Sequence, residues 1–121
     1  MLTDPLQPSV DVRFTPEFKR NLRALAKRYR NIRADIEPVI EQLQSGHVIG
    51  DQIPRLGHTL YKVRIRNTDS RRGKSGGYRM IYYLRTQQSI VLITLYSKSD
   101  QADISANDVR QIIREFEKTV P

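Results

Sequence analysis

The chain has 121 residues, of which 38% are hydrophobic and 28% charged, and its formal net charge at pH 7 is +8. This length and composition are typical of one globular domain and exclude a largely disordered protein. The absence of cysteine excludes disulfides and thiolate metal sites. We therefore expect a single domain over residues 1–121, stabilised by packing, with residues 1–9 as a loose lead-in.

The sequence has no recognisable targeting or membrane-spanning pattern. Its first residues include acids and prolines where a signal peptide has a basic and then an apolar run, and the longest purely aliphatic run is Ile90–Ile93. The two histidines, His47 and His58, have no neighbouring ligand residues that would complete a zinc site. We therefore expect a cytoplasmic protein that uses no metal or other cofactor.

The first elements are predicted to be a strand and a helix. Apolar and charged residues alternate over residues 10–14, as in a half-buried strand. Thr15 then precedes Pro16, which is the pattern of a helix N-cap followed by proline at the first helical position. Apolar residues recur at spacings of four, three and four from Phe18 to Tyr29, so we expect a helix with a basic outer face.

A second helix is predicted between Asn31, a suitable N-cap, and residues 45–46. Pro38 lies several residues inside it, where proline removes a backbone hydrogen bond and clashes with the preceding turn. We therefore expect a kink at Pro38 or a helix that begins later. The apolar positions on one face of this helix are Ile32, Ile36, Val39, Ile40 and Leu43.

Three strands and a last helix are predicted in the second half. Apolar and cationic side chains alternate over residues 61–66, and residues 78–85 carry one apolar face and a second face that includes arginines at both ends. Residues 89–97 are apolar on both faces, as in an interior strand. Ser105 and Asp108 have the spacing of a capping box, which predicts the start of the last helix. This helix carries its apolar residues on one face as far as Phe116.

The order of these elements, β-α-α-β-β-β-α, predicts an α+β fold. We expect a small antiparallel sheet of about four strands, in which three successive strands are joined by hairpins and the first strand is added by a longer route. The two N-terminal helices are expected to pack on one face of the sheet, with a C-terminal helix following the last strand.

The positive charge is concentrated in one segment. Residues 56–98 contain nine Lys or Arg against one acid, whereas residues 1–55 contain nine against seven and residues 99–121 three against five. Because a basic strip on a sheet repels itself on folding, a polyanion is the first partner to expect. The nine cations are Lys62, Arg64, Arg66, Arg71, Arg72, Lys74, Arg79, Arg85 and Lys98.

Part of this charge lies in a polar loop over residues 67–77. Gly73-Lys74-Ser75 does not form a phosphate-binding loop, because Thr68 replaces the required first glycine and a strand follows instead of a helix. We interpret the loop as a flexible basic arm, in which Gly76 and Gly77 let the chain turn sharply into the next strand. A plain loop kept soluble by its charge is the alternative.

The remaining cations can gather on one face of the sheet. Side chains two residues apart in a strand project from the same face, and neighbouring strands can add to that face. Such a patch could bind phosphates while Tyr96 stacks on a base of single-stranded RNA, or it could catalyse attack of a ribose 2′-hydroxyl on the next phosphate. A face of solvated basic chains is the alternative. The patch would comprise Lys62, Arg64, Arg66, Arg79, Tyr96 and Lys98.

These residues resemble a known family. The run YKVRIR at residues 61–66, the run GYRMIYY at residues 77–83 and the lysine-containing turn that leads to the last helix are similar to the RelE/ParE toxin superfamily of bacterial type II toxin-antitoxin pairs. The loop GKSGGYR at residues 73–79 is similar to the HigB-like branch of that superfamily. The resemblance spans residues 10–118.

The resemblance implies an endoribonuclease that inhibits translation by cutting messenger RNA in the decoding site of the ribosome, without a metal. Lys62 and Arg64 would activate the 2′-hydroxyl and hold phosphate, Arg79 would stabilise the transition state, and Lys98 would assist the leaving oxygen. The base-stacking tyrosine of RelE corresponds here to Ile104, so Tyr96 is the candidate replacement. The residues expected to bind RNA are Arg66, Arg71, Arg72, Lys74 and Tyr96.

Two other functions are compatible with the sequence. A ParE-like inhibitor of DNA gyrase shares the fold, and a nucleic-acid-binding module without activity would need only the basic arm. The cationic sheet face favours the ribonuclease. The resemblance further implies a cognate antitoxin that is acidic where it covers the patch. It would be encoded next door with a helix-turn-helix domain, so that operator DNA is bound only through the antitoxin.

Overall fold

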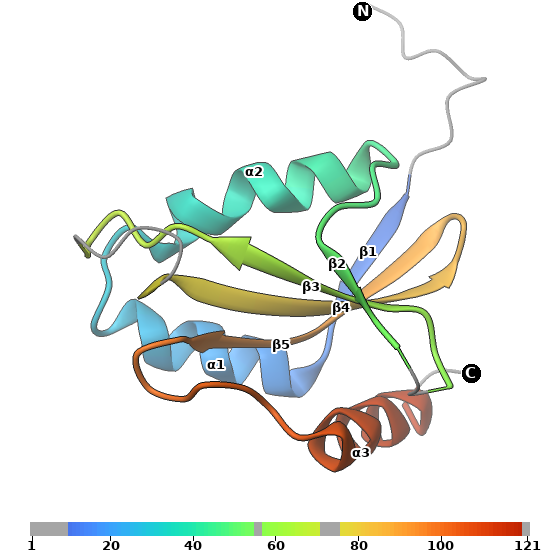
Figure 1. Cartoon of the computed structure of the whole chain (residues 1–121). Coiled ribbons are helices and arrows are strands. Elements are labelled where there is room, and N and C mark those ends of the chain that lie inside the picture. The colour runs from blue at the N-terminus through green and yellow to red at the C-terminus, as the bar shows by residue number, and fades with distance from the viewer. Residues whose placement is uncertain (1–9, 55–56, 71–75, 120–121) are drawn as a thin grey trace, which may run out of the picture.

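The computed structural model describes residues 10–54, 57–70 and 76–119, which form a five-stranded sheet and three helices (Figure 1). No helix within these residues is long and apolar enough to cross a membrane. In chain order the elements are β1 (Asp11–Phe14), α1 (Pro16–Ala26), α2 (Ile32–Gln44), β2 (Asp51–Ile53), β3 (Leu60–Ile65), β4 (Tyr78–Thr86), β5 (Ser89–Ser97) and α3 (Ala106–Glu117).

The strands lie in the order β1-β5-β4-β3-β2. The hairpin strands β3, β4 and β5 are antiparallel, as predicted, but β1 pairs with β5 in parallel, so the sheet is mixed. The fifth strand, β2, was not predicted, because three residues with one apolar side chain show no periodic pattern. It pairs antiparallel with β3 at the sheet edge and places Asp51 opposite Lys62.

The predicted caps of the first and last helices are confirmed. The Thr15 hydroxyl oxygen accepts a hydrogen bond from the backbone N–H of Phe18 at 2.9 Å, and the Ser105 hydroxyl oxygen accepts one from Asp108 N–H at 3.1 Å. Thr15 is fully buried and also donates to the carbonyl of Ile93 at 2.7 Å, so the cap ties α1 to the sheet. Helix α1 ends at Ala26, and Tyr29 packs against the core from beyond its end.

Helix α2 begins at Ile32 and continues through Pro38, so the predicted later start is wrong. Asn31 precedes it without making a side-chain cap. Both the backbone N–H and the side-chain amide of Asn31 instead donate to the carboxylate of Asp69, at 2.8 and 3.1 Å. In return, Asp35 of α2 accepts hydrogen bonds from Thr68. These two carboxylates anchor the start of the loop after β3 to the start of α2.

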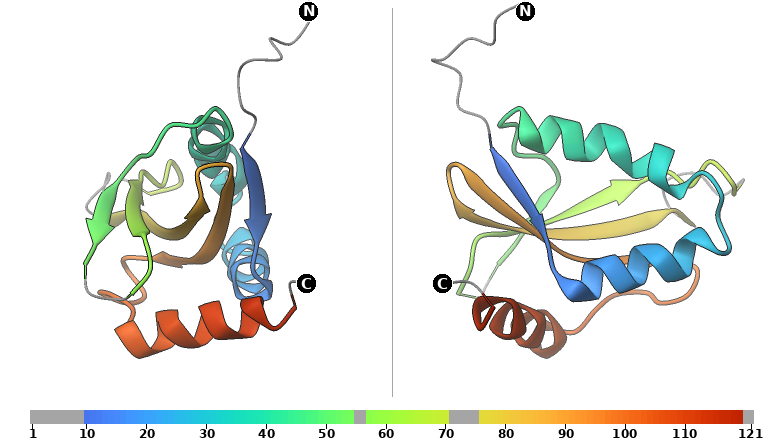
Figure 2. Two further views of the ribbon diagram at one scale, coloured as in Figure 1. Left: turned by 90° about the vertical axis from the view of Figure 1, so that its right-hand side faces the viewer. Right: turned by 180° about the vertical axis from the view of Figure 1, so that it is seen from behind.

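The sheet separates two hydrophobic clusters, with α2 and α3 on opposite sides of it (Figures 1 and 2). Helices α1 and α2 contribute Phe18, Leu25, Ile32, Ile36 and Leu43 to the larger cluster, so both cover one face, as predicted. Helix α3 packs Val109, Ile113 and Phe116 against the smaller cluster on the other face. As predicted, β5 lies in the interior of the sheet, and its residues 90–97 are all buried.

Candidate functional site

The strand register aligns three of the predicted site residues. Arg64 of β3 lies opposite Arg79 of β4, which lies opposite Tyr96 of β5. Directly paired residues in neighbouring strands project from the same face, so these three side chains form a row across the sheet. Lys62 lies two residues before Arg64 on that face, and Lys98 follows the end of β5.

This row forms the floor of a pocket of about 360 Å³. All four residues predicted to be catalytic, Lys62, Arg64, Arg79 and Lys98, line it together with Tyr96. The edge strand β2 and the segment before α3 complete the wall, with residues 51–54, Ala102 and Asp103. Strands β3 and β4 and the residue that follows β5 therefore bring the predicted cations to one concave site.

Among the other predicted RNA-binding residues outside the row, the structure describes only Arg66. Arg66 is exposed, follows the end of β3 and does not line the pocket. Arg71, Arg72 and Lys74 lie outside the described residues.

Arg79 is the most buried of the four cations, with 6% of its surface exposed. Its Nη1 donates a hydrogen bond to the carbonyl of Tyr78 at 3.1 Å. Arg64 lies directly opposite on β3, and like charges in such a pair repel each other. An anion placed between the two guanidinium groups would relieve this repulsion, and arginine can bind phosphate through two parallel hydrogen bonds.

The hydroxyl of Tyr96 is held at the edge of the same pocket. Only 6% of this residue is exposed, because its ring belongs to the cluster under α3. Burial, followed by the negative charge of Asp103 and their hydrogen bond, raises the pKa of Tyr96 to about 12. The residue is therefore a neutral hydroxyl at pH 7, and little of its ring is available for a stacked base.

Asp103 is a site residue that the sequence analysis missed. It precedes α3, and its Oδ1 accepts three hydrogen bonds: from Lys62 Nζ at 2.7 Å, from the Tyr96 hydroxyl at 3.2 Å and from Ile104 N–H at 2.8 Å. The hydrogen bond from Lys62 is the largest influence that holds the pKa of Asp103 below its ordinary value. Because Asp103 lies outside the periodic segments, no sequence pattern indicated that it approaches β3.

A bulge in β5 directs Tyr96 into the site. Ile81 pairs with Thr94 but Tyr82 pairs with Leu92, so Ile93 is an extra residue on β5. Consequently Val91 and Tyr96, which strict alternation would place on opposite faces, both join the cluster under α3. The bulged backbone is held by α1, since Thr15 donates to the carbonyl of Ile93 and the Asn21 side-chain oxygen accepts from Leu95 N–H and the Thr94 hydroxyl.

The close approach of β3 and β4 explains why glycine precedes Tyr78. A Cβ atom added to Gly77 would clash with the carbonyl oxygen of Ile65. The carbonyl of Gly77 also accepts a hydrogen bond from Lys98 N–H at 2.9 Å, which fixes the backbone of that site residue. Gly77 lies in a bend directly before β4, as expected, but it has no positive φ, so the close contact between the two backbones is what requires glycine there.

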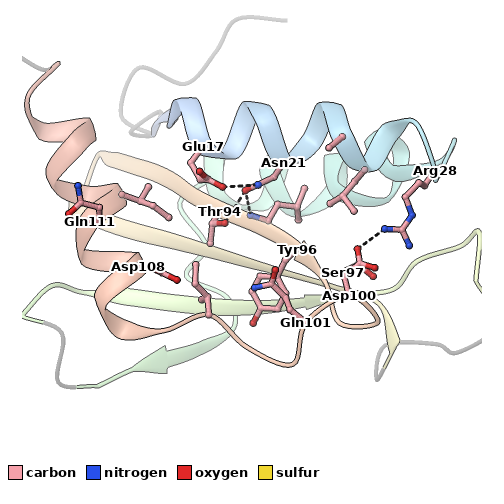
Figure 3. A pocket seen from close by; sticks show the side chains of 15 residues that line it. Glu17, Asn21, Arg28, Thr94, Tyr96, Ser97, Asp100, Gln101, Asp108 and Gln111 are labelled. Carbon is pink, nitrogen blue, oxygen red and sulfur yellow. Dashed lines mark hydrogen bonds and ion pairs between the residues drawn. The ribbon is translucent and has the colours of Figure 1, made fainter.

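A larger pocket, of about 550 Å³, lies between α1 and α3 (Figure 3). Its wall includes the acids Glu17, Asp100 and Asp108, and Arg28 forms an ion pair with Asp100 at 2.6 Å. This lining offers a polyanion little attraction. The smaller cationic pocket therefore has the chemistry that a nucleic acid requires, and Tyr96 lies between the two.

The histidines lie outside the cationic pocket. His58 packs edge-on against Tyr83 at 5.1 Å, and His47 is exposed. Within residues 10–54, 57–70 and 76–119, no three His, Cys, Asp or Glu side chains are grouped so that they could hold a metal ion. The polar side chains that line the pocket carry cations, a hydroxyl, carboxylates and the amide of Gln52.

Residues 18–120 match a family model described as the RelE toxin of the RelE / RelB toxin-antitoxin system. The match extends from the first turn of α1 to beyond the end of α3, so it includes every residue of the cationic pocket.

Proposed function

The chain belongs to the RelE toxin family, and from this premise we propose that it is a ribosome-dependent endoribonuclease that cleaves messenger RNA. As a toxin of a toxin-antitoxin system it has a cognate antitoxin. One observation supports cleavage above all: four cations from β3, β4 and the position after β5 line one pocket together with Tyr96. We place this activity in the cytoplasm, where the ribosome is.

The proposed reaction is an internal transfer of the phosphoryl group. The 2′-oxygen of a ribose forms a bond to the adjacent phosphorus, and the bond between that phosphorus and the 5′-oxygen of the next nucleotide breaks. The 2′-hydroxyl loses its proton to a base, and the 5′-oxygen gains a proton. The products carry a 2′,3′-cyclic phosphate and a 5′-hydroxyl. Negative charge grows on the phosphoryl oxygens in the transition state, where fixed cations lower the barrier most.

The cations of the pocket supply a group for each requirement except the base. Arg64 and Arg79 face each other across the strands and can hold the phosphoryl oxygens between them. We assign transition-state stabilisation to Arg79, because its burial keeps water away and strengthens its interaction with charge. Lys62 and Arg64 contact the attacking side and the phosphate. Lys98, at the end of β5, donates the proton that the leaving 5′-oxygen requires.

Mapping RNA ends in a translating extract tests the proposal. The purified chain is expected to produce new 5′-hydroxyl ends in phase with codons, and only while ribosomes occupy the message. Gyrase-linked DNA breaks without RNA cuts would instead identify a gyrase inhibitor. Binding to RNA without either product would identify a non-catalytic module.

Neutralisation by the antitoxin follows from the same site. We propose that the antitoxin, encoded next door, covers the cationic pocket with acidic residues and carries a helix-turn-helix domain, so that the pair contacts operator DNA only through the antitoxin. Induction of the chain alone is expected to stop growth, and induction together with the adjacent reading frame to restore it.

A further inference from the structure

The proposed reaction leaves one proton without an acceptor. Lysine is the usual candidate in a pocket rich in cations, but it accepts a proton only as the neutral amine. Lys62 Nζ lies 2.7 Å from Asp103 Oδ1, an ion pair that is made by the protonated amine. In this arrangement Lys62 can donate a proton but cannot accept one. The acceptor is therefore to be sought among the carboxylates of the pocket, Asp51 and Asp103.

Of these two carboxylates, Asp103 is the one that the pocket holds in place. Its Oδ1 is fixed by three donors, Lys62, Tyr96 and Ile104, which come from β3, β5 and the segment before α3. Its Oδ2 accepts no hydrogen bond from the described part of the chain, and 64% of its side chain is exposed, so a substrate can reach it. The described residues give the Asp51 carboxylate no hydrogen-bond donor that would hold it in the pocket.

We propose that Asp103 is the general base of the proposed ribonuclease, and that an incoming phosphate frees it from Lys62. The inference rests on the proposed function. Asp103 Oδ2 takes the proton of the 2′-hydroxyl as the 2′-oxygen bonds to phosphorus, and the P–O5′ bond breaks with a proton from Lys98. Asp103 then loses its new proton to water, and Lys98 regains a proton from water. All atoms and charges balance, and no further reagent is needed.

Electrostatics couples substrate binding to this base. In the free chain the ammonium of Lys62 stabilises the carboxylate of Asp103, which makes it a weak proton acceptor. A bound phosphate competes for Lys62 and adds negative charge close to Asp103. Both changes favour protonation of the carboxylate, so Asp103 becomes a stronger base only when a phosphate is present. The Tyr96 and Ile104 hydrogen bonds keep Oδ1 in place while Lys62 moves to the phosphate.

The test compares two isosteric variants, Asp103→Asn and Asp100→Asn. Asp100 is a matched control, because it is an exposed aspartate of the same β5–α3 segment, is ion-paired to Arg28 at 2.6 Å and does not line the cationic pocket. Single-turnover cleavage is measured on ribosomes that hold one defined message. Asp103→Asn is expected to slow the chemical step by about 10²–10⁴-fold, the usual contribution of a general base. Its KM should stay the same or fall, since a negative charge has left a cationic pocket.

A second substrate separates the base from a merely structural role. Sulfur in place of the bridging 5′-oxygen gives a leaving group that needs no proton. This substrate should restore the cleavage rate of Lys98→Ala but not that of Asp103→Asn. Thermal unfolding followed by circular dichroism should show that Asp103→Asn remains folded, because asparagine can still accept the hydrogen bonds of Tyr96 and Ile104.

Each outcome is decisive. Cleavage by Asp103→Asn within about threefold of the unsubstituted chain, or rescue of Asp103→Asn by the sulfur substrate, overturns the assignment of the base. A higher KM with an unchanged chemical step also overturns it and makes Asp103 a positioning residue for Lys62. If the unsubstituted chain cleaves no message, the proposed function itself fails, and the base with it.

Discussion

The two faces of the sheet are built by the same strands, but one is covered by helices and the other carries the cationic pocket. On the face under α1 and α2, Val63, Met80 and Leu95 are buried in the larger hydrophobic cluster. Their chain neighbours Arg64, Arg79 and Tyr96 project to the other face and line the pocket. Because α3 covers only part of that face, the rest is open to a ligand. Residues of the core and residues of the pocket are thus neighbours in each strand. A substitution at the first kind should lower stability, and one at the second kind should lower activity.

The largest effect is expected on the covered face. Met80 is fully buried, so Met80→Ala should lower the free energy of unfolding by about 2–5 kcal/mol through lost contacts and a cavity. Urea denaturation measures this change. Lys98→Ala, at an exposed position, is the control and should leave the midpoint almost unchanged. A Met80→Ala protein as stable as the original would contradict the division between the two faces.

At the next position, Arg79→Ala should abolish toxicity while the fold is retained. Loss of one buried cation at the phosphate should reduce cleavage by about 10²–10³-fold. The melting temperature should not fall much, because repulsion from Arg64 is relieved at the same time. Growth after induction and single-turnover cleavage measure the effect, with Arg79→Lys as the control that keeps the charge. Full toxicity of folded Arg79→Ala would eliminate its assigned role.

Alkaline titration compares how strongly each face of the sheet shields a tyrosine hydroxyl from water. Burial is the main cause that raises the pKa of Tyr82, under α1 and α2, and of Tyr96, at the pocket, to about 12 in each case. In the unfolded chain tyrosine ionises near its ordinary value of about 10. The unfolded state therefore loses protons first, and the free energy of unfolding should fall as pH rises from about 10 to about 12.

Tyr82→Phe and Tyr96→Phe should each remove part of this pH dependence, which also separates it from the titration of lysines. Denaturation at several pH values measures the slopes. Equal pH dependence in all three proteins would show that neither hydroxyl is protected from ionisation by the fold.

The smallest effect is expected outside the pocket. Arg66 is exposed beyond the end of β3, so Arg66→Ala should weaken association with the ribosome without changing the chemical step. One lost phosphate contact makes the slope of log affinity against log salt shallower by about 0.7. Arg66→Lys keeps the charge and should keep the slope. A fall in single-turnover rate at saturating enzyme would instead place Arg66 in the reaction.

The elements of the fold could be predicted where side chains repeat with a clear period. The starts of α1 and α3 follow from Thr15 and Ser105, and the hairpin strands follow from their alternation. Strand β2 could not be predicted, since three residues show no period and only pairing with β3 makes them a strand. The parallel orientation of β1 was also hidden, because β1 and its partner β5 are far apart in the chain.

The candidate site was predictable to a similar degree. Alternation places Lys62 and Arg64 on one face, and the structure brings them together with Arg79, Tyr96 and Lys98. Asp103 could not be predicted, because its contacts with Lys62 and Tyr96 span 41 and 7 residues and depend on the path of an irregular segment. The bulge at Ile93 was equally hidden, although it decides which face Tyr96 joins.

By itself, the sequence determined what depends on neighbours in the chain: the caps, the periodic faces and the concentration of positive charge between residues 56 and 98. Tertiary structure alone decided how those faces pack together and that Asp103 contacts Lys62 in the cationic pocket. It also decided which part of the sheet α3 leaves uncovered. The physical reason is that periodicity fixes the direction of a side chain within its own element. Distances between elements are set by strand pairing and by the packing of helices, which involve residues far apart in the chain.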